Sequence, residues 1–222
     1  MQILKFQGDK VGHVVMSAVD NAVESGWGKA QVRAGTITGE TIDARVKSYV
    51  KSVARELATT GAAVGGTAAA PGVGTAVAVV ASVVDIAYVT KRSCDMMLVI
   101  AALHGHEAAT VEERKMWLLT VLAFGDTASA TFAKIAAEAG KGLGRKAVGA
   151  IPAKSLLQIN RVIGRTILTK YGTKRGAVAL GRLLPFGFGA AIGGTANYVT
   201  TRTLARHTNK FFTELPYDRI ES

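Results

Sequence analysis

Residues 57–84 read LATTGAAVGGTAAAPGVGTAVAVVASVV and contain no charged side chain. Most of these residues are alanine, glycine, valine or threonine, a composition that favours closely packed helices. Pro71 and Gly72 interrupt the stretch, and a proline inside a helix costs about 3 kcal/mol because it removes a backbone hydrogen bond and clashes with the preceding turn. We therefore expect two helices that meet at Pro71 rather than one membrane-spanning helix, and the second should extend to about Leu103.

A second uncharged stretch, residues 184–201, has the same character, with Pro185 followed by several glycines. Alternation of apolar and polar residues with flanking turns, the mark of strands, does not persist along the chain. We predict an all-α protein, a single compact bundle of about seven to nine helices with two Gly/Ala-rich apolar hairpins broken at Pro71 and Pro185. Small residues let helix backbones approach closely. The glycines expected at such contacts are Gly61, Gly65, Gly187, Gly189 and Gly193.

Apolar residues spaced three and four apart predict the other helices. These should lie near residues 10–23, 42–56, 111–124, 128–139 and 155–170. Asp9, Thr41 and Thr110 are suited to cap three of them at the N-terminus. The polar residues 26–39 read as a linker. We expect an N-terminal helix and linker at 1–40, a helical domain at 41–215 that packs with them as one unit, and a tail at 216–222.

The net charge of +11 belongs entirely to the C-terminal third. Residues 139–213 contain thirteen Lys or Arg and no Asp or Glu, which leaves fourteen basic against sixteen acidic residues in the rest. A concentrated positive charge predicts an anionic partner, either a membrane surface, an acidic protein or nucleic acid. The alternative is a basic face that is merely solvated.

Residues 155–170 form the best candidate for contact with such a partner. Leu156, Ile159 and Ile163 share one face of the expected helix, whereas Arg161 and Arg165 lie one turn apart on the other. The same pattern also fits an ordinary outer helix of a bundle. The residues expected to bind an anionic surface are Lys141, Arg145, Lys146, Arg161, Arg165, Lys170, Lys174 and Arg175.

Catalytic and metal-binding patterns are weak. His104 and His106 are two apart but have no third ligand at a suitable spacing, so we expect no metal. Cys94 lies among apolar residues and near Asp95, surroundings that oppose a thiolate, and a place in the core is expected. The glycine-rich segments match neither phosphate-binding nor dinucleotide-binding patterns. We expect no cofactor. Nucleic-acid binding is disfavoured because aromatic residues of the basic third, such as Phe186, Phe188 and Tyr198, lie in the apolar stretch rather than among its basic residues.

The two apolar stretches also carry a family resemblance. Residues 184–198, LPFGFGAAIGGTANY, with Thr201 and Arg202, resemble the signature of EcsC proteins, in which a proline-glycine turn precedes Gly-Gly, an Asn and a Thr-Arg pair. Three further elements resemble the central region of that family: Pro71-Gly72 with Asp85-Ile86, residues 100–105, and residues 112–114. His104 departs from the usual tyrosine of the family. The resemblance spans roughly residues 55–212 and implies an all-helical bacterial domain without implying a particular reaction.

The resemblance implies that Asp85, Asn197 and Arg202 are the polar residues most important to the protein. Polar groups in apolar helices need partners, so we expect these three side chains to form a structural polar network.

Together these patterns predict a non-enzymatic, cytoplasmic protein at the inner face of the membrane that binds anionic lipid through its basic third. The lone Cys94 and a start without the features of a signal peptide favour this location. One alternative is a soluble regulatory module that binds an acidic protein. Another is a membrane-damaging effector whose apolar hairpins insert into lipid. A larger assembly is compatible with each of these functions.

Overall fold

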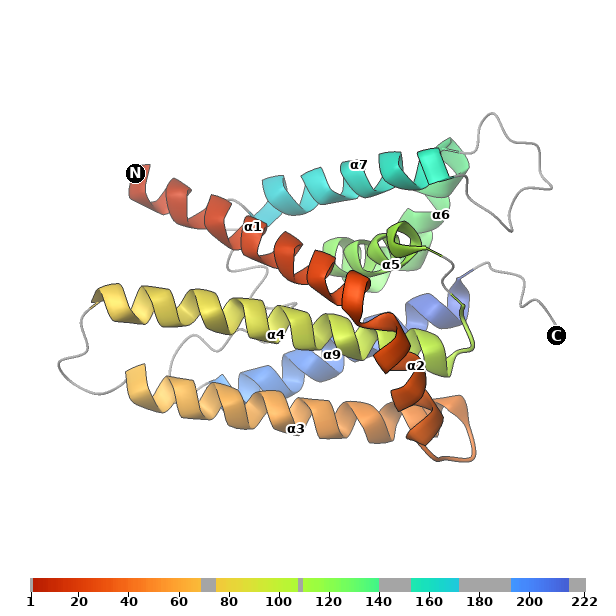
Figure 1. The fold of residues 1–222 in the computed structure, drawn as a ribbon, viewed down its shortest axis with the longest axis horizontal. Helices are drawn as coiled ribbons and strands as arrows, with labels where there is room; N and C mark the ends of the chain where they lie inside the picture. The colour runs from red at the N-terminus through yellow and green to blue at the C-terminus, as the bar shows by residue number, and fades with distance from the viewer. Residues whose placement is uncertain (1, 69–74, 108–109, 140–152, 172–192, 216–222) are drawn as a thin grey trace.

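The computed structural model describes residues 2–68, 75–107, 110–139, 153–171 and 193–215, and all regular structure in these ranges is helical (Figure 1). The prediction of an all-α bundle is confirmed. The elements are α1 (Gln2–Ser25), α2 (Trp27–Thr36), α3 (Ile42–Ala68), α4 (Thr75–Leu103), α5 (Val111–Phe124), the short 3-10 turn η1 (Gly125–Thr127), α6 (Ala128–Ala139), α7 (Ala153–Tyr171) and α9 (Gly193–Glu214). The predicted tail at 216–222 and the predicted break at Pro185 lie outside the described residues.

Helices α3 and α4 run antiparallel along the length of the molecule, and α9 packs against both (Figure 1). Because α3 ends at Ala68 and α4 begins at Thr75, two helices flank Pro71, as predicted. A bidentate ion pair joins them: Arg92 Nη2 and Nε donate to the two carboxylate oxygens of Glu56 at 2.7 and 2.8 Å. The hydrogen bond from Arg92 is the main cause that lowers the pKa of Glu56, against the opposing effect of burial.

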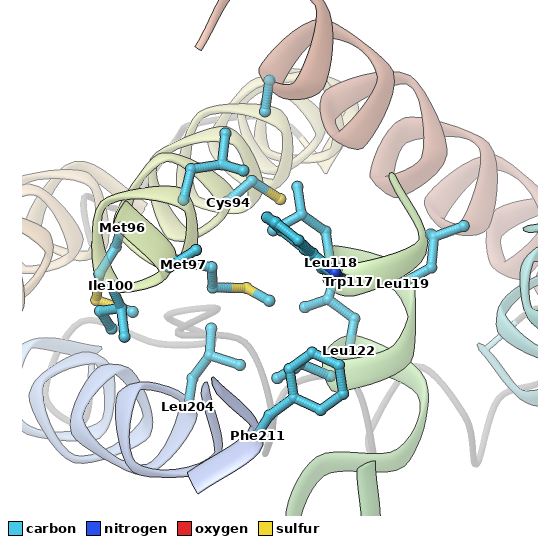
Figure 2. Close-up of a cluster of buried hydrophobic side chains, with 14 of the residues drawn as sticks. Cys94, Met96, Met97, Ile100, Trp117, Leu118, Leu119, Leu122, Leu204 and Phe211 are labelled. Atoms are coloured by element: carbon cyan, nitrogen blue, oxygen red, sulfur yellow. The ribbon is translucent and has the colours of Figure 1, made fainter. Parts of the chain in front are cut away.

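The core forms where α4, α5 and α9 meet (Figure 2). In α5 every residue from Met116 to Ala123 is buried, and in α4 every residue from Met96 to Ala101 is buried as well. A helix that is apolar on all sides lies at the centre of a bundle. Met97 and Leu122 face Leu204 and Phe211 of α9 across this centre (Figure 2).

Two of the three predicted N-caps are confirmed. Thr110 Oγ1 accepts a hydrogen bond from the Glu113 backbone N–H at 3.1 Å, and Thr41 Oγ1 accepts one from Ala44 N–H at 3.1 Å. The prediction for Asp9 is wrong, because α1 already begins at Gln2 and Asp9 lies within it. The apolar spacing explains the longer helix, since Leu4 lies two helical turns before Val11.

Helix α2 replaces part of the predicted linker. Only Ala30 and Ala34 of this helix are buried, so its apolar signal is small in the sequence. Tertiary contacts hold it: Arg45 of α3 donates from Nε to the Ile37 carbonyl and from Nη2 to the Ala34 carbonyl, both at 2.8 Å. The first bond satisfies the Ile37 carbonyl at the end of the helix, and the second adds to the bond that the Ala34 carbonyl accepts from the Ile37 N–H at 3.2 Å.

Gly26 allows the sharp change of direction between α1 and α2. A side chain at this position would meet the Ala22 carbonyl oxygen and would lie 3.1 Å from Leu98 Cδ1. The absence of a Cβ therefore lets the junction approach α4 closely. Both α1 and α2 pack on α4.

One helical stretch among the described residues, Val111–Ile135, is long and apolar enough to cross a membrane when only length and composition are considered. It has a mean hydropathy of 1.3, and 61% of its apolar window is buried inside the protein. The stretch comprises α5, η1 and most of α6, and α5 is the central core helix. Its apolar character is thus accounted for by burial within the bundle.

Candidate functional site

The candidate site is the outer face of α7. The packing of the inner face determines which side chains of this helix point outward. Leu156, Ile159, Ile163 and Ile167 are buried, as their spacing predicted, and α7 packs on α5 and α1. Asn160 Nδ2 also donates to the Glu112 carbonyl at 2.8 Å. These contacts fix the rotation of α7 about its own axis, so the opposite side of the helix must face outward.

The outer face of α7 combines positive charge with exposed apolar surface. Arg161 and Arg165 are exposed, as predicted, and Arg165 also takes part in an interaction within the protein. Leu157 and Val162 lie beside them with 54% and 50% of their surface exposed. Apolar side chains exposed beside cations on one helix face are the combination found on helices that lie at a membrane interface. In Figure 1, α7 lies along an edge of the molecule.

The remaining predicted contact residues cannot be placed on this face. Lys170 belongs to α7, but its side chain is not among those described. Lys141, Arg145, Lys146, Lys174 and Arg175 lie outside the described residues. The predicted anionic-surface site is thus represented by Arg161 and Arg165.

Helix α9 carries a second set of cations. Arg202, Arg206 and Lys210 are exposed and are spaced four residues apart, so they follow one side of the helix. Arg202 lies over the Tyr198 ring, with 5.7 Å from its Cζ to the ring centroid, and Lys210 Nζ lies 3.6 Å from Asp126 Oδ1. Arg206 and Lys210 were not among the predicted contact residues, although their four-residue spacing is visible in the sequence. The described cations of the C-terminal third are thus presented on two separate helices.

The three residues of the predicted polar network are not seen in contact with one another among the described side chains. Asn197 is buried in α9, and its Nδ2 donates to the Leu57 carbonyl of α3 at 3.1 Å. Arg202 lies on the same helix but is exposed, so the structure does not bring it to Asn197. Asp85 lies in α4, and its side chain is outside the described part. Asn197 therefore joins α9 to α3, the pair of helices with the most extensive contact.

The structure does not describe the packing around any of the five glycines that were predicted at helix contacts. Gly61 and Gly65 lie in the last turns of α3, and Gly193 is the first residue of α9. Gly187 and Gly189 are not in the described ranges.

Cys94 occupies the core. Its side chain is fully buried, and burial, followed by the nearby negative charge of Asp95, raises the pKa of the thiol. A protonated, inaccessible thiol is a poor nucleophile. Within the described residues, no group of three or more His, Cys, Asp or Glu side chains is arranged to hold a metal ion.

A pocket of about 360 Å³ lies at one end of the bundle, where α3 begins and α4 and α9 end. Its lining residues are Thr41, Ile42, Asp43, His104, His106, Phe212, Thr213 and Leu215. The sequence drew attention to His104 and His106 but gave no sign that Asp43, about sixty residues earlier in the chain, would line the same pocket.

The end of α4 positions both histidines. Gly105 has φ +77°, a left-handed conformation that glycine adopts readily. The His106 N–H donates to the Ala101 carbonyl and the Gly105 N–H donates to the Ala102 carbonyl, each at 3.1 Å. This pattern of two bonds ends a helix with a tight turn. The turn directs the chain so that His104 and His106 both reach the pocket.

No protein-family model, no curated protein and no solved structure matches this chain. Function is therefore inferred from the chemistry of the two surfaces described above: the basic and apolar face of α7, and the pocket at the end of the bundle.

Proposed function

We propose that the protein binds peripherally to anionic membrane surfaces through the outer face of α7, and that it does so without catalysing a reaction. The observation that carries this proposal is the exposure of Leu157 and Val162 beside Arg161 and Arg165. A helix that lies in the plane of a membrane interface needs both features, apolar side chains that enter the acyl boundary and cations that meet the headgroups.

Charge supports the same proposal. Helix α7 contains no acidic residue, and none occurs anywhere between residues 139 and 213. Each Lys or Arg near an anionic lipid surface contributes about 1 kcal/mol to attachment at physiological salt. A few such residues together with two exposed apolar side chains are enough for reversible binding that weakens as salt increases.

The resemblance to EcsC proteins belongs to this proposal. Membership of that family would make this a bacterial domain, and a site at the cytoplasmic face of the inner membrane would supply the anionic lipid that α7 requires. The all-helical architecture supports this assignment only at the level of fold class.

Co-sedimentation with lipid vesicles tests the proposal. The protein should sediment with vesicles that contain phosphatidylglycerol at low salt, should stay in solution with pure phosphatidylcholine vesicles, and should be released from the anionic vesicles at high salt. Failure to bind anionic vesicles at low salt, or equal binding to neutral vesicles, would overturn it. The second result would indicate that charge does not direct the attachment.

A further inference from the structure

The hydrogen bonds among Asp43, Asn209 and His104 at the pocket determine which of their atoms donate and which accept. The Asp43 carboxylate can only accept hydrogen bonds, so the Asn209 amide nitrogen must donate to it, as the 3.1 Å contact between Nδ2 and Oδ1 shows. Asn209 Oδ1 then faces His104 Nε2 at 2.8 Å. Because that oxygen only accepts, His104 Nε2 must carry the hydrogen, so in the neutral tautomer the lone pair lies on Nδ1.

His104 lies in a position suited to a ligand. Its side chain is about nine-tenths buried and lines the pocket, and no partner for Nδ1 lies among the residues that the structure describes. Asp43 lines the same pocket from the first turn of α3. A carboxylate and an imidazole lone pair are both acceptors, so the matching ligand group is a hydrogen-bond donor.

The local field also favours a cation. Helices α4 and α9 both end at the pocket, at Leu103 and Glu214, and each C-terminus carries roughly half a negative charge, whereas the N-terminus of α3 contributes roughly half a positive one. His106 Nε2 donates to the Phe212 carbonyl at 2.8 Å and so satisfies one acceptor of α9. The full charge of Asp43 adds to the negative side, and the balance at the pocket is negative.

The apolar part of the lining distinguishes an organic cation from a metal ion. Ile42, Phe212 and Leu215 form part of the wall. A metal ion would need more ligands in a regular arrangement, and the described residues provide no such group of three. A volume of about 360 Å³ falls at the lower end of the range for small-molecule pockets.

We propose that this pocket binds a small organic ammonium ion, whose N–H groups donate to the Asp43 carboxylate and to His104 Nδ1 and whose alkyl part contacts Ile42, Phe212 and Leu215. The site is independent of the membrane-binding face, because its residues come from α3, the end of α4 and the end of α9 rather than from α7.

Titration with n-butylammonium chloride, followed by the ¹⁵N and ¹H signals of the histidine rings, tests this proposal at constant pH and ionic strength. Saturable changes at His104 are expected for butylammonium. Sodium butyrate, an anion with a similar alkyl chain, and sodium chloride should leave these signals unchanged. An equal response to sodium chloride, or a stronger response to butyrate than to butylammonium, would overturn the proposal.

Two variants locate the site. Asp43→Asn removes the charge while it keeps an acceptor for Asn209, and it should weaken butylammonium binding about tenfold or more, since hydrogen bonds to a charged group are the stronger ones. Thr213→Phe, at an exposed position on the wall, should block the pocket while Asp43 and His104 are retained. Glu138→Gln, which removes an exposed acid of α6, is the matched control and should not alter the affinity.

The variants are compared only where their thermal denaturation shows a folded protein. Unchanged affinity in a folded Asp43→Asn or a folded Thr213→Phe variant would place the ligand elsewhere and overturn the proposal. Should Asp43→Asn fail to fold, Thr213→Phe alone decides the outcome.

Discussion

Replacing Arg161 and Arg165 together by glutamine should weaken attachment to anionic vesicles by about thirtyfold. The magnitude follows from the exposure of the two side chains on the outer face of α7. Two cations at about 1 kcal/mol each give about 2 kcal/mol, and each 1.4 kcal/mol corresponds to a factor of ten in affinity. Glutamine removes the charge and keeps a polar side chain at each exposed position, so the buried contacts of Leu156 and Ile163 on the opposite face should be unaffected.

The assay compares the variant with a control that loses the same charge elsewhere. Lys47→Gln/Lys51→Gln removes two exposed cations of α3 that have the same four-residue spacing. Vesicle co-sedimentation at several lipid concentrations gives the partition coefficient of each protein, and thermal denaturation shows whether the internal interaction of Arg165 affects stability. If both double variants lose affinity equally, binding reflects net charge alone, and the assignment of the site to α7 is refuted.

Three further predictions concern the interior of the bundle. Asn197→Ala should reduce the free energy of unfolding by about 0.5–1.5 kcal/mol in urea denaturation, because the buried hydrogen bond from Asn197 Nδ2 to the Leu57 carbonyl is lost; an unchanged value would mean that this bond does not stabilise the contact of α3 with α9. Cys94 should react with iodoacetamide at neutral pH only as fast as the protein unfolds, because burial raises the pKa of its thiol, and rapid labelling of the native protein would contradict its place in the core. Burial lowers the pKa of His207, with Asp126 opposing this shift and Arg206 and Lys210 adding to it, so the unfolded chain binds this proton more readily than the folded protein. Stability from His207 is therefore present above the unfolded pKa of about 6.5 and is lost as pH falls below it. His207→Gln should make the melting temperature less dependent on pH in that window, and an equally steep or steeper dependence would contradict the assignment.

Features that depend on short-range spacing could be predicted from the sequence. The buried residues of α7 repeat at three and four positions, and Thr110 stands three residues before Glu113, from whose N–H it accepts a hydrogen bond. In each case the residues that produce the feature are neighbours in the sequence. The two helices on either side of Pro71 follow from the chemistry of a single residue type. In all three cases the physical cause lies within one or two helical turns of its effect.

Features that depend on contacts distant in sequence could not be predicted. Helix α2 shows little apolar periodicity, and it is held by Arg45 from the next helix. The pocket requires Asp43, His104 and Asn209 to meet, although they come from three helical elements far apart in the chain. No local pattern encodes such a meeting, because it depends on where the ends of α3, α4 and α9 fall in the assembled bundle.

The motif Tyr-Val-Thr-x-Arg, at residues 88–92 and 198–202, illustrates the same limit. Both copies lie on helices that contact α3. Arg92 nevertheless forms a bidentate ion pair with Glu56, whereas Arg202 is exposed and lies over Tyr198. Nearly identical local sequences therefore acquire different roles, because only the first of these two arginines meets an acidic residue of α3.

The position of α5 determines which kind of membrane attachment is consistent with this fold. Moving α5 into lipid would only exchange one apolar environment of its side chains, such as Trp117 and Leu118, for another. The buried faces of α4, α7 and α9 that contact α5 would instead face water, and each large apolar side chain exposed in this way costs about 1.5–3 kcal/mol. Several such side chains outweigh the roughly 2 kcal/mol that Arg161 and Arg165 contribute to lipid binding. Attachment through α7 therefore favours an intact bundle on the membrane surface over insertion of α5.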